Sequence, residues 1–290
     1  MLYQTENQHG GDVYGGGITL DFSANTNPLG TPPGVLEAVR RGLPQLHRYP
    51  DPYCRQLVQA IAAHEQVPAS YVLCGNGAAD LIYAYCAALR PRTAAEPAPT
   101  FAEYGLGLAQ VGCRAAPYFL HQAENFDVDE GFLPFLEEKK PEVVFLCTPN
   151  NPTGRLLPLP LLEQILQGCA AWGARVFLDE CFLDLTEDGV SAKALLAAHP
   201  ELLILKAFTK SYGMAGIRLG YCLCADSALL HRMASASQPW NVSSLAQSAG
   251  VAALAEQDFL RRTRELIRTE RRWLTDNLTA LGFWVCPSHA

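Results

Sequence analysis

Short apolar runs alternate with longer amphipathic segments over most of the 290 residues of the chain. Brief runs of branched, aromatic and cysteine side chains, the pattern of buried strands, cover residues 71–74, 143–147, 175–178, 202–205 and 219–224. Apolar positions recur with helical spacing over residues 33–41, 53–64, 78–89, 159–172 and 257–281. Strands that alternate with helices predict an α/β fold with a largely parallel sheet.

Other segments are less regular. Residues 19–23 predict a short extended piece, and residues 25–30, which contain Pro28 and Gly30, predict a turn. Residues 92–98 include two charged residues and a proline, so they match an apolar strand poorly. Residues 283–286 are apolar again and are expected to enter a new strand shortly before Ala290.

Composition narrows the function classes. Hydrophobic residues make up 49% and charged residues 18% of the chain, as in ordinary soluble enzymes. A net charge of -7 argues against general affinity for nucleic acid, and no apolar run reaches the roughly 20 residues that a membrane helix needs. The ten cysteines form no C-x-x-C pair, which disfavours zinc and disulfides. Because the start lacks a signal-peptide pattern, we expect a cytoplasmic protein with reduced thiols and no metal site.

Lys210 is the first candidate for chemistry. It follows the apolar run at residues 202–205 and is expected in the glycine-containing loop beyond that strand. Such a lysine can form a Schiff base with an aldehyde cofactor, and Thr209 and Arg218 can hold that cofactor's phosphate. Alone, the segment could instead be a surface lysine beside a structural arginine.

Polar residues also follow the other strands, where ligands of open α/β sheets bind. The backbone of Gly75, Asn76, Gly77 and Ala78 follows one strand and opens a helix, so its N–H groups can cradle a phosphate. An ordinary helix-entry turn explains this motif equally well. Asn151 lies in the Thr-Pro-Asn-Asn-Pro-Thr-Gly string after another strand, where it would be a neutral donor.

Asp179 ends the apolar run at residues 175–178. Burying a carboxylate there is costly unless it meets a cation, and a protonated pyridine nitrogen would be a suitable one. A helix cap or a salt bridge is the alternative for Asp179 taken alone.

In their order and spacing these motifs resemble the fold-type I pyridoxal-phosphate enzymes. The similarity is to the class I/II aminotransferases in the histidinol-phosphate aminotransferase-like branch, from about residue 9 to the end. It implies a mostly parallel, seven-stranded central sheet flanked by helices, and a second, small domain. The implied domains are an arm with the first part of the small domain (1–40), a large cofactor-binding domain (41–245), and a connecting helix with the start of a truncated small domain (246–290).

The resemblance also implies roles for individual residues around pyridoxal 5′-phosphate. Lys210 would carry the Schiff base and shuttle protons, and Asp179 would pair with the pyridinium nitrogen. Asn151 would hydrogen-bond the 3-oxygen of the ring and face the substrate, and Tyr104 would stack on the ring.

A second set of implied roles concerns the cofactor phosphate. The backbone of residues 75–78 would bind it together with Thr209 and Arg218. Tyr49 would reach the phosphate of a partner subunit, which makes the family an obligate homodimer with shared active sites.

Narrower motifs at residues 9–11, 21–30, 48–51 and 101–104 resemble the threonine-phosphate decarboxylases of that branch. They imply decarboxylation of L-threonine O-3-phosphate to (R)-1-amino-2-propanol O-2-phosphate for cobalamin, with His9 and Asn27 facing this phosphorylated substrate. Phe182 agrees, since histidinol-phosphate aminotransferases usually have tyrosine there. The alternatives are an aminotransferase of that type and a non-catalytic, cofactor-binding dimerisation protein. A nucleotide-binding oxidoreductase is disfavoured, because no glycine string has the G-x-G-x-x-G pattern.

Overall fold

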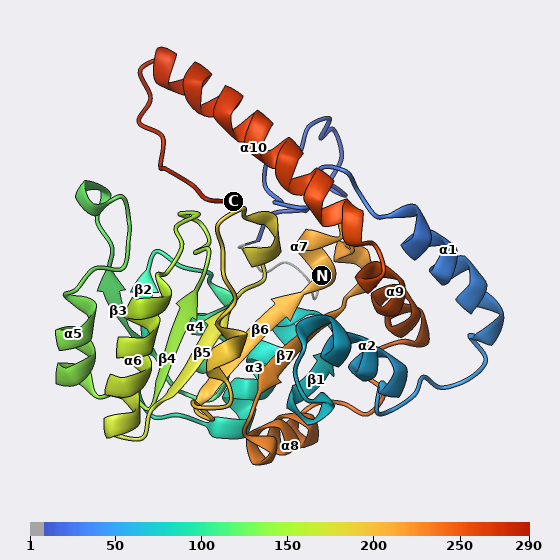
Figure 1. Ribbon diagram of the computed structural model, residues 1–290, viewed down its shortest axis with the longest axis horizontal. Coiled ribbons are helices and arrows are strands. Elements are labelled where there is room, and N and C mark those ends of the chain that lie inside the picture. Colours follow the sequence, from blue (N-terminus) through green and yellow to red (C-terminus); the bar gives the residue numbers. More distant parts are fainter. Residues whose placement is uncertain (1–8) are drawn as a thin grey trace.

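Seven strands form one sheet in the computed structural model, which describes residues 9–290 (Figure 1). The sheet order is β1-β7-β6-β5-β4-β2-β3. The strands are β1 (Val72–Gly75), β2 (Ala94–Ala98), β3 (Ala115–Phe119), β4 (Val143–Cys147), β5 (Arg175–Asp179), β6 (Leu202–Ala207) and β7 (Gly220–Cys224). β7 is antiparallel to both of its neighbours and the other pairs are parallel, which confirms the predicted, mostly parallel α/β sheet.

Ten α-helices surround the sheet in the described part of the chain. They are α1 (Pro33–Gly42), α2 (Arg55–Glu65), α3 (Ala78–Leu89), α4 (Glu103–Gln110), α5 (Phe132–Lys139), α6 (Leu159–Ala171), α7 (Phe208–Ser211), α8 (Ser227–Ala236), α9 (Ser244–Leu254) and α10 (Gln257–Ala280). The buried side chains form two clusters, one on each face of the sheet. Helices α2, α5, α6 and α9 contribute to the first, and α3, α4 and α8 to the second.

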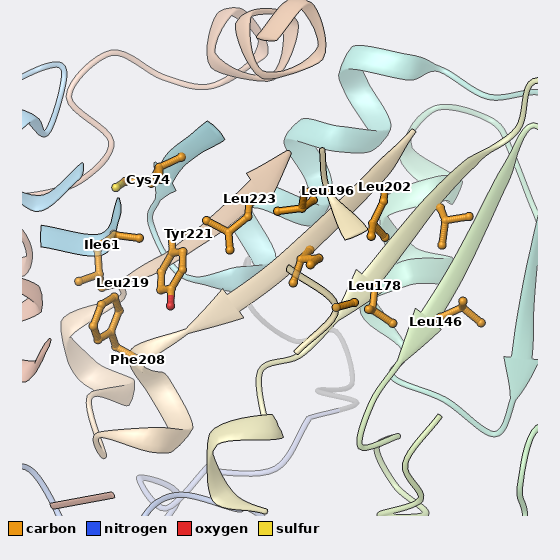
Figure 2. Packing of buried hydrophobic residues seen from close by; sticks show 14 of the residues in the cluster. Ile61, Cys74, Leu146, Leu178, Leu196, Leu202, Phe208, Leu219, Tyr221 and Leu223 are labelled. Atoms are coloured by element: carbon orange, nitrogen blue, oxygen red, sulfur yellow. The ribbon is translucent and has the colours of Figure 1, made fainter. Parts of the chain in front are cut away.

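Alternation along each strand explains the two clusters. In β4, Val144 and Leu146 pack in the first cluster, whereas Val143, Phe145 and Cys147 pack in the second. Figure 2 shows the first face, where side chains from successive strands, among them Leu146 and Leu178, lie in one layer. Because both faces of the central strands are covered, β4, β5, β6 and β7 are largely apolar, which is why their positions could be predicted. β3 is only partly buried and was not predicted.

One strand prediction was wrong, at residues 283–286, and one strand forms from a poor match. Residues 94–98 form β2 although Glu96 and Pro97 interrupt the apolar pattern. The small side chains of Ala94 and Ala95 fit between β3 and β4, and only this pair is in register with β4, so Pro97 lies outside that ladder. Residues 283–286 form no strand, because a strand needs a hydrogen-bonded neighbour and none of the described residues provides one.

The last residues instead fold back onto the turn after β4. His289 donates its backbone N–H to the carbonyl oxygen of Gly154, at 2.8 Å, and Arg155 donates from its guanidinium to the carbonyl oxygen of Pro287. The long helix α10 projects from the body of the molecule before this return, and α1 packs on α9 (Figure 1). The division at residues 40 and 245 remains a prediction.

Candidate active site

Four strands that run in the same direction, β1, β4, β5 and β6, end at one edge of the sheet, and the predicted site residues lie at these ends or just after them. In the register of the sheet Asp179 lies opposite Cys147 of β4 and Leu205 of β6. Gly75 and Ala207 both lie opposite Gly220 of β7. The segments that follow β1, β4, β5 and β6 therefore begin close together, as expected for a ligand site of an open α/β sheet.

Asp179 is a buried acid whose described partners are neutral. Its side chain is 4% exposed. Oδ2 accepts a 2.8 Å hydrogen bond from the Tyr104 hydroxyl, and Oδ1 accepts one of 2.8 Å from the backbone N–H of Cys181. Burial raises the pKa of Asp179, opposed by these two donors. A cationic partner would favour the ionised form.

Lys210 lies on the one-turn helix α7, and not in a loop as predicted, because β6 continues to Ala207 and the helix starts at Phe208. Phe208 and Ser211 are buried and anchor the turn, while Lys210 is half-buried. Its Nζ lies 5.6 Å from the centroid of the Phe182 ring. Loss of solvent lowers the pKa of Lys210, and the nearby Arg218 charge lowers it further, against the opposing effect of Cys181.

The turn between β1 and α3 has the shape of an anion cradle. Gly77 is the N-cap of α3 with φ +85°, and no side chain caps the helix there. A Cβ on Gly77 would lie 2.5 Å from Nη2 of Arg218, so the guanidinium packs directly on this glycine. The N–H groups of Asn76 and Gly77 are used by Asp80 and by the carbonyl oxygen of Gly75, so the N–H groups from Ala78 onward, at the uncapped start of α3 beside an arginine, are those that suit a phosphate. Thr209 is half-buried on α7, next to Lys210.

A cavity of ≈ 340 Å³ opens beside this edge. Its lining includes Asn151 and Phe182 from the strand ends, Asn25 and Thr26 from the N-terminal segment, and Ser288. Since Phe182 also lies beside the Lys210 amine, the cavity and the lysine belong to one site. The structure thus brings Lys210, Asn151 and the ring of Phe182 together.

Two predicted residues make contacts other than the expected ones. Tyr104 has no exposed surface, and its ring stacks on Phe145 with 5.3 Å between centroids. Its described role is to donate to Asp179, and stacking on a cofactor ring stays a prediction. Asn27 is buried, and its amide donates to the carbonyl oxygen of Ser211 and to Oγ1 of Thr263, so it joins the N-terminal segment to α7 and α10.

The remaining predicted residues lie at the periphery. His9 contacts the carboxylate of Glu103, and its ring lies 6.0 Å from that of Phe101. Tyr49 is 80% exposed and stacks on Trp240, with centroids 4.6 Å apart. Neither residue lines the cavity near Lys210.

One contact and one residue of the site were missed at the sequence level. The hydrogen bond between Tyr104 and Asp179 joins residues 75 positions apart, and no local signal could have revealed it. Asp80 accepts from the backbone N–H of Asn76 in the cradle. An acid in the first turn of a predicted helix is a known sign of such a bond and could have been noticed.

The described residues contain no cluster of three or more histidine, cysteine or acidic side chains that could hold a metal ion. Over residues 9–290, no helix is long and apolar enough to cross a membrane.

The profile described as "Aminotransferase class I and II" matches residues 18–290. The chain belongs to this family. Among curated members, it is 40% identical over 251 residues to a threonine-phosphate decarboxylase from Salmonella typhimurium. That alignment covers 87% of this chain and 69% of that protein. It is 33% identical over 267 residues to histidinol-phosphate aminotransferase 1 from Cupriavidus pinatubonensis, covering 91% of this chain and 70% of that protein.

The fold agrees with this membership of the class I and II aminotransferases. A crystal structure of the histidinol-phosphate aminotransferase from Clostridium acetobutylicum superposes with a TM-score of 0.85 at 26% identity. The match covers 92% of this chain and 79% of that one. The predicted family is therefore confirmed, and with it the fold class.

Proposed function

We propose that this protein is a pyridoxal-phosphate-dependent decarboxylase of L-threonine O-3-phosphate, with (R)-1-amino-2-propanol O-2-phosphate as product. The observation that carries the proposal is the 40% identity to a threonine-phosphate decarboxylase over 87% of the chain. This product is a building block of cobalamin, so the reaction would serve cobalamin synthesis.

The site fits the cofactor on three structural grounds. Asp179 is a buried acid with only neutral described partners, which a protonated ring nitrogen would complement. Lys210 is an amine with a lowered pKa at the same edge, suited to attack an aldehyde. The Gly77 cradle beside Arg218 suits the phosphate, with Thr209 adjacent to the lysine.

The chain's own residues then have distinct tasks. Lys210 would attach the cofactor through Nζ, and Asp179 would hold the ring nitrogen in its charged form, while Tyr104 and Cys181 orient Asp179. When bound, pyridoxal phosphate supplies a ring that accepts the electron pair of the bond broken at the substrate α-carbon. Loss of the carboxylate as carbon dioxide leaves that carbon one proton short, and Nζ of Lys210 would deliver it.

Orientation of the substrate decides which bond breaks. The bond held perpendicular to the cofactor ring is weakened, so a decarboxylase must direct the carboxylate there and an aminotransferase the Cα–H bond. In the described structure Asn151 and Phe182 line the cavity beside Lys210 and are the candidates for this orienting role.

An aminotransferase acting on a phosphorylated amino acid is the second candidate. The 33% identity to histidinol-phosphate aminotransferase 1 over 91% of the chain favours it, and so does the similarity of the folds. Both candidates share the cofactor residues and differ only in how substrate is held.

Product analysis separates them. The purified protein, loaded with pyridoxal phosphate, would be incubated either with threonine phosphate or with histidinol phosphate and 2-oxoglutarate. Lys210→Ala would serve as the inactive control. We expect carbon dioxide and aminopropanol phosphate in equal amounts, with or without 2-oxoglutarate. Glutamate as the main product would instead identify an aminotransferase. A lysine-bound chromophore with neither product would indicate a non-catalytic cofactor-binding protein.

A further inference from the structure

Asp80 joins two separate parts of the molecule through one carboxylate oxygen. Its Oδ2 accepts a 2.9 Å hydrogen bond from the backbone N–H of Asn76, in the turn that opens α3. The same oxygen accepts another of 2.9 Å from Nδ2 of Asn241, 161 positions further along the chain. Asp80 lies in the first turn of α3 and is half-buried.

The first of these hydrogen bonds fixes the turn of the phosphate cradle. Asn76 lies between Gly75 and Gly77, and the N–H of Gly77 donates to the carbonyl oxygen of Gly75 at 2.8 Å. A Cβ on Gly75 would lie 3.0 Å from Oδ2 of Asp80, so the carboxylate packs on the backbone at the end of β1. A negative charge beside an anion site opposes the binding of phosphate. The Asp80 carboxylate is therefore explained by the backbone geometry that it fixes, and not by contact with the phosphate.

The second hydrogen bond restrains the segment that carries Trp240. Trp240 has φ +55°, a left-handed backbone conformation that is costly for a bulky residue and needs support from its surroundings. Asn241, bound to Asp80, is the next residue. The Trp240 ring stacks on Tyr49, so Asp80 connects the cradle to this exposed aromatic pair.

We propose that Asp80 is a positioning residue for recognition of the cofactor phosphate. It holds the backbone of residues 75–78 in the shape that binds the phosphate, and it sets the position of Trp240 and Tyr49, without touching the ligand. The inference rests on the proposed cofactor, and it concerns the phosphate alone. Attachment of the aldehyde at Lys210 does not depend on it.

Comparison of pyridoxal phosphate with pyridoxal tests this role, since pyridoxal lacks only the phosphate. Both would be titrated into the unmodified protein, Asp80→Ala and Asp80→Asn, and followed by the absorbance of the lysine-bound form. We expect Asp80→Ala to raise the apparent Kd for pyridoxal phosphate about tenfold, as the loss of hydrogen bonds to a charged group implies, and to leave that for pyridoxal unchanged. Asp80→Asn keeps an acceptor oxygen, so its Kd for pyridoxal phosphate should rise less.

Ser243→Ala is the matched control. The Ser243 hydroxyl caps α9 by accepting from the backbone N–H of Ala246, and it lies outside the cradle. This variant also loses a hydrogen bond at a helix start, so its two Kd values should stay as in the unmodified protein.

Several results would overturn the role of Asp80. Equal weakening for both ligands would show a general structural effect, and no weakening would show no role at all. If Asp80→Ala does not fold, Asn241→Ala, which removes only the second hydrogen bond, is measured in the same way. There too, a loss confined to pyridoxal phosphate supports the proposal and any other pattern contradicts it. Unmodified protein that binds both ligands equally would overturn the cofactor assignment as well.

Discussion

The Tyr104 hydroxyl donates a 2.8 Å hydrogen bond to Oδ2 of Asp179, and both side chains are removed from solvent. The bond favours the ionised form of Asp179 against the effect of burial. Burial also raises the pKa of Tyr104, so its proton stays in place as a donor. Tyr104 thereby helps to keep a carboxylate ready for a cation at the edge of the sheet.

Tyr104→Phe should lower activity with little change in fold. The loss of a hydrogen bond to a charged group is worth about 1.5–3 kcal/mol, so we expect kcat to fall by roughly 10- to 100-fold. The acidic limb of the pH–rate profile should also move to higher pH, because Asp179 loses a donor that stabilises its ionised form. Steady-state kinetics as a function of pH measure both effects.

Tyr85→Phe is the control for this substitution. Tyr85 is fully buried among the same aromatic side chains, but its hydroxyl has no described hydrogen-bond partner. Removing it should leave kcat and the pH profile unchanged. Equal losses in both variants would show that Tyr104 acts through packing only.

Much of the fold was predictable because the strands are covered on both faces. Residues 143–147 and 78–89 match β4 and α3 at both ends, since each is bounded by residues that end the pattern. β2 matched an apolar strand poorly, because its place in the sheet depends on two small alanines fitting between neighbours and not on its own apolarity. Whether small side chains fit between two strands depends on those strands and cannot be seen in the local sequence.

The candidate site was predictable where a polar residue follows an apolar strand. Asp179 and Lys210 were found in this way, and the sheet brings their segments to one edge. Contacts between distant elements were not predictable. Asn27 was expected to face the substrate, which stays a prediction, and the donation of its amide to the carbonyl oxygen of Ser211 and to Oγ1 of Thr263 was not foreseen.

Substitution of two lysines four positions apart should have opposite effects, one on the stability of the fold and the other on attachment of the cofactor. Lys206 is 5% exposed, and its Nζ lies 3.0 Å from Oε1 of Glu65 and 3.2 Å from Oδ1 of Asp184. Lys206→Met would leave these carboxylates without their buried cation, so we expect a loss of about 3–5 kcal/mol in the free energy of unfolding. Lys210→Met removes an amine that is only half-buried, and the loss should be below about 1 kcal/mol.

Urea unfolding of the cofactor-free proteins measures this difference, and absorbance of the lysine-bound cofactor gives the complementary result. Lys210→Met should fold but acquire no chromophore. Lys206→Met should retain the chromophore wherever it is folded. A Lys206→Met variant as stable as the unmodified protein would contradict the assigned role of the ion cluster.

The stability of the cofactor-free protein should have a maximum near pH 4.5. Lys206 and hydrogen bonds lower the pKa of Glu65 to about 2 against the effect of burial, so its contribution is present above its ordinary value of 4.5 and is lost as pH falls towards 2. Burial raises the pKa of Glu180 to about 7, so the folded state holds this proton more tightly and loses stability as pH rises from 4.5 to 7. Each difference is worth about 3 kcal/mol.

Unfolding free energies between pH 3 and 8 test this, with Glu180→Gln as the informative variant. Because the amide does not titrate, this variant should lose less stability between pH 4.5 and 7 than the unmodified protein. The fall below pH 4.5 should remain, since it arises from Glu65. If the loss of stability between pH 4.5 and 7 is the same in Glu180→Gln as in the unmodified protein, the charge of Glu180 is compensated in the folded state.

Mixed dimers test whether Tyr49 acts on a partner subunit. Tyr49 is 80% exposed, and the Trp240 ring holds it at the surface. If it reaches the partner's cofactor phosphate, Tyr49→Ala and Lys210→Ala should each be nearly inactive, yet a mixture refolded together should regain activity. Each mixed dimer has one site with an intact Lys210 from one subunit and an intact Tyr49 from the other, so about a quarter of the full activity is expected. Without recovery, Tyr49 would serve its own subunit, and the shared site would be wrong; Tyr53→Ala, a neighbouring exposed tyrosine, is the control and should remain active alone.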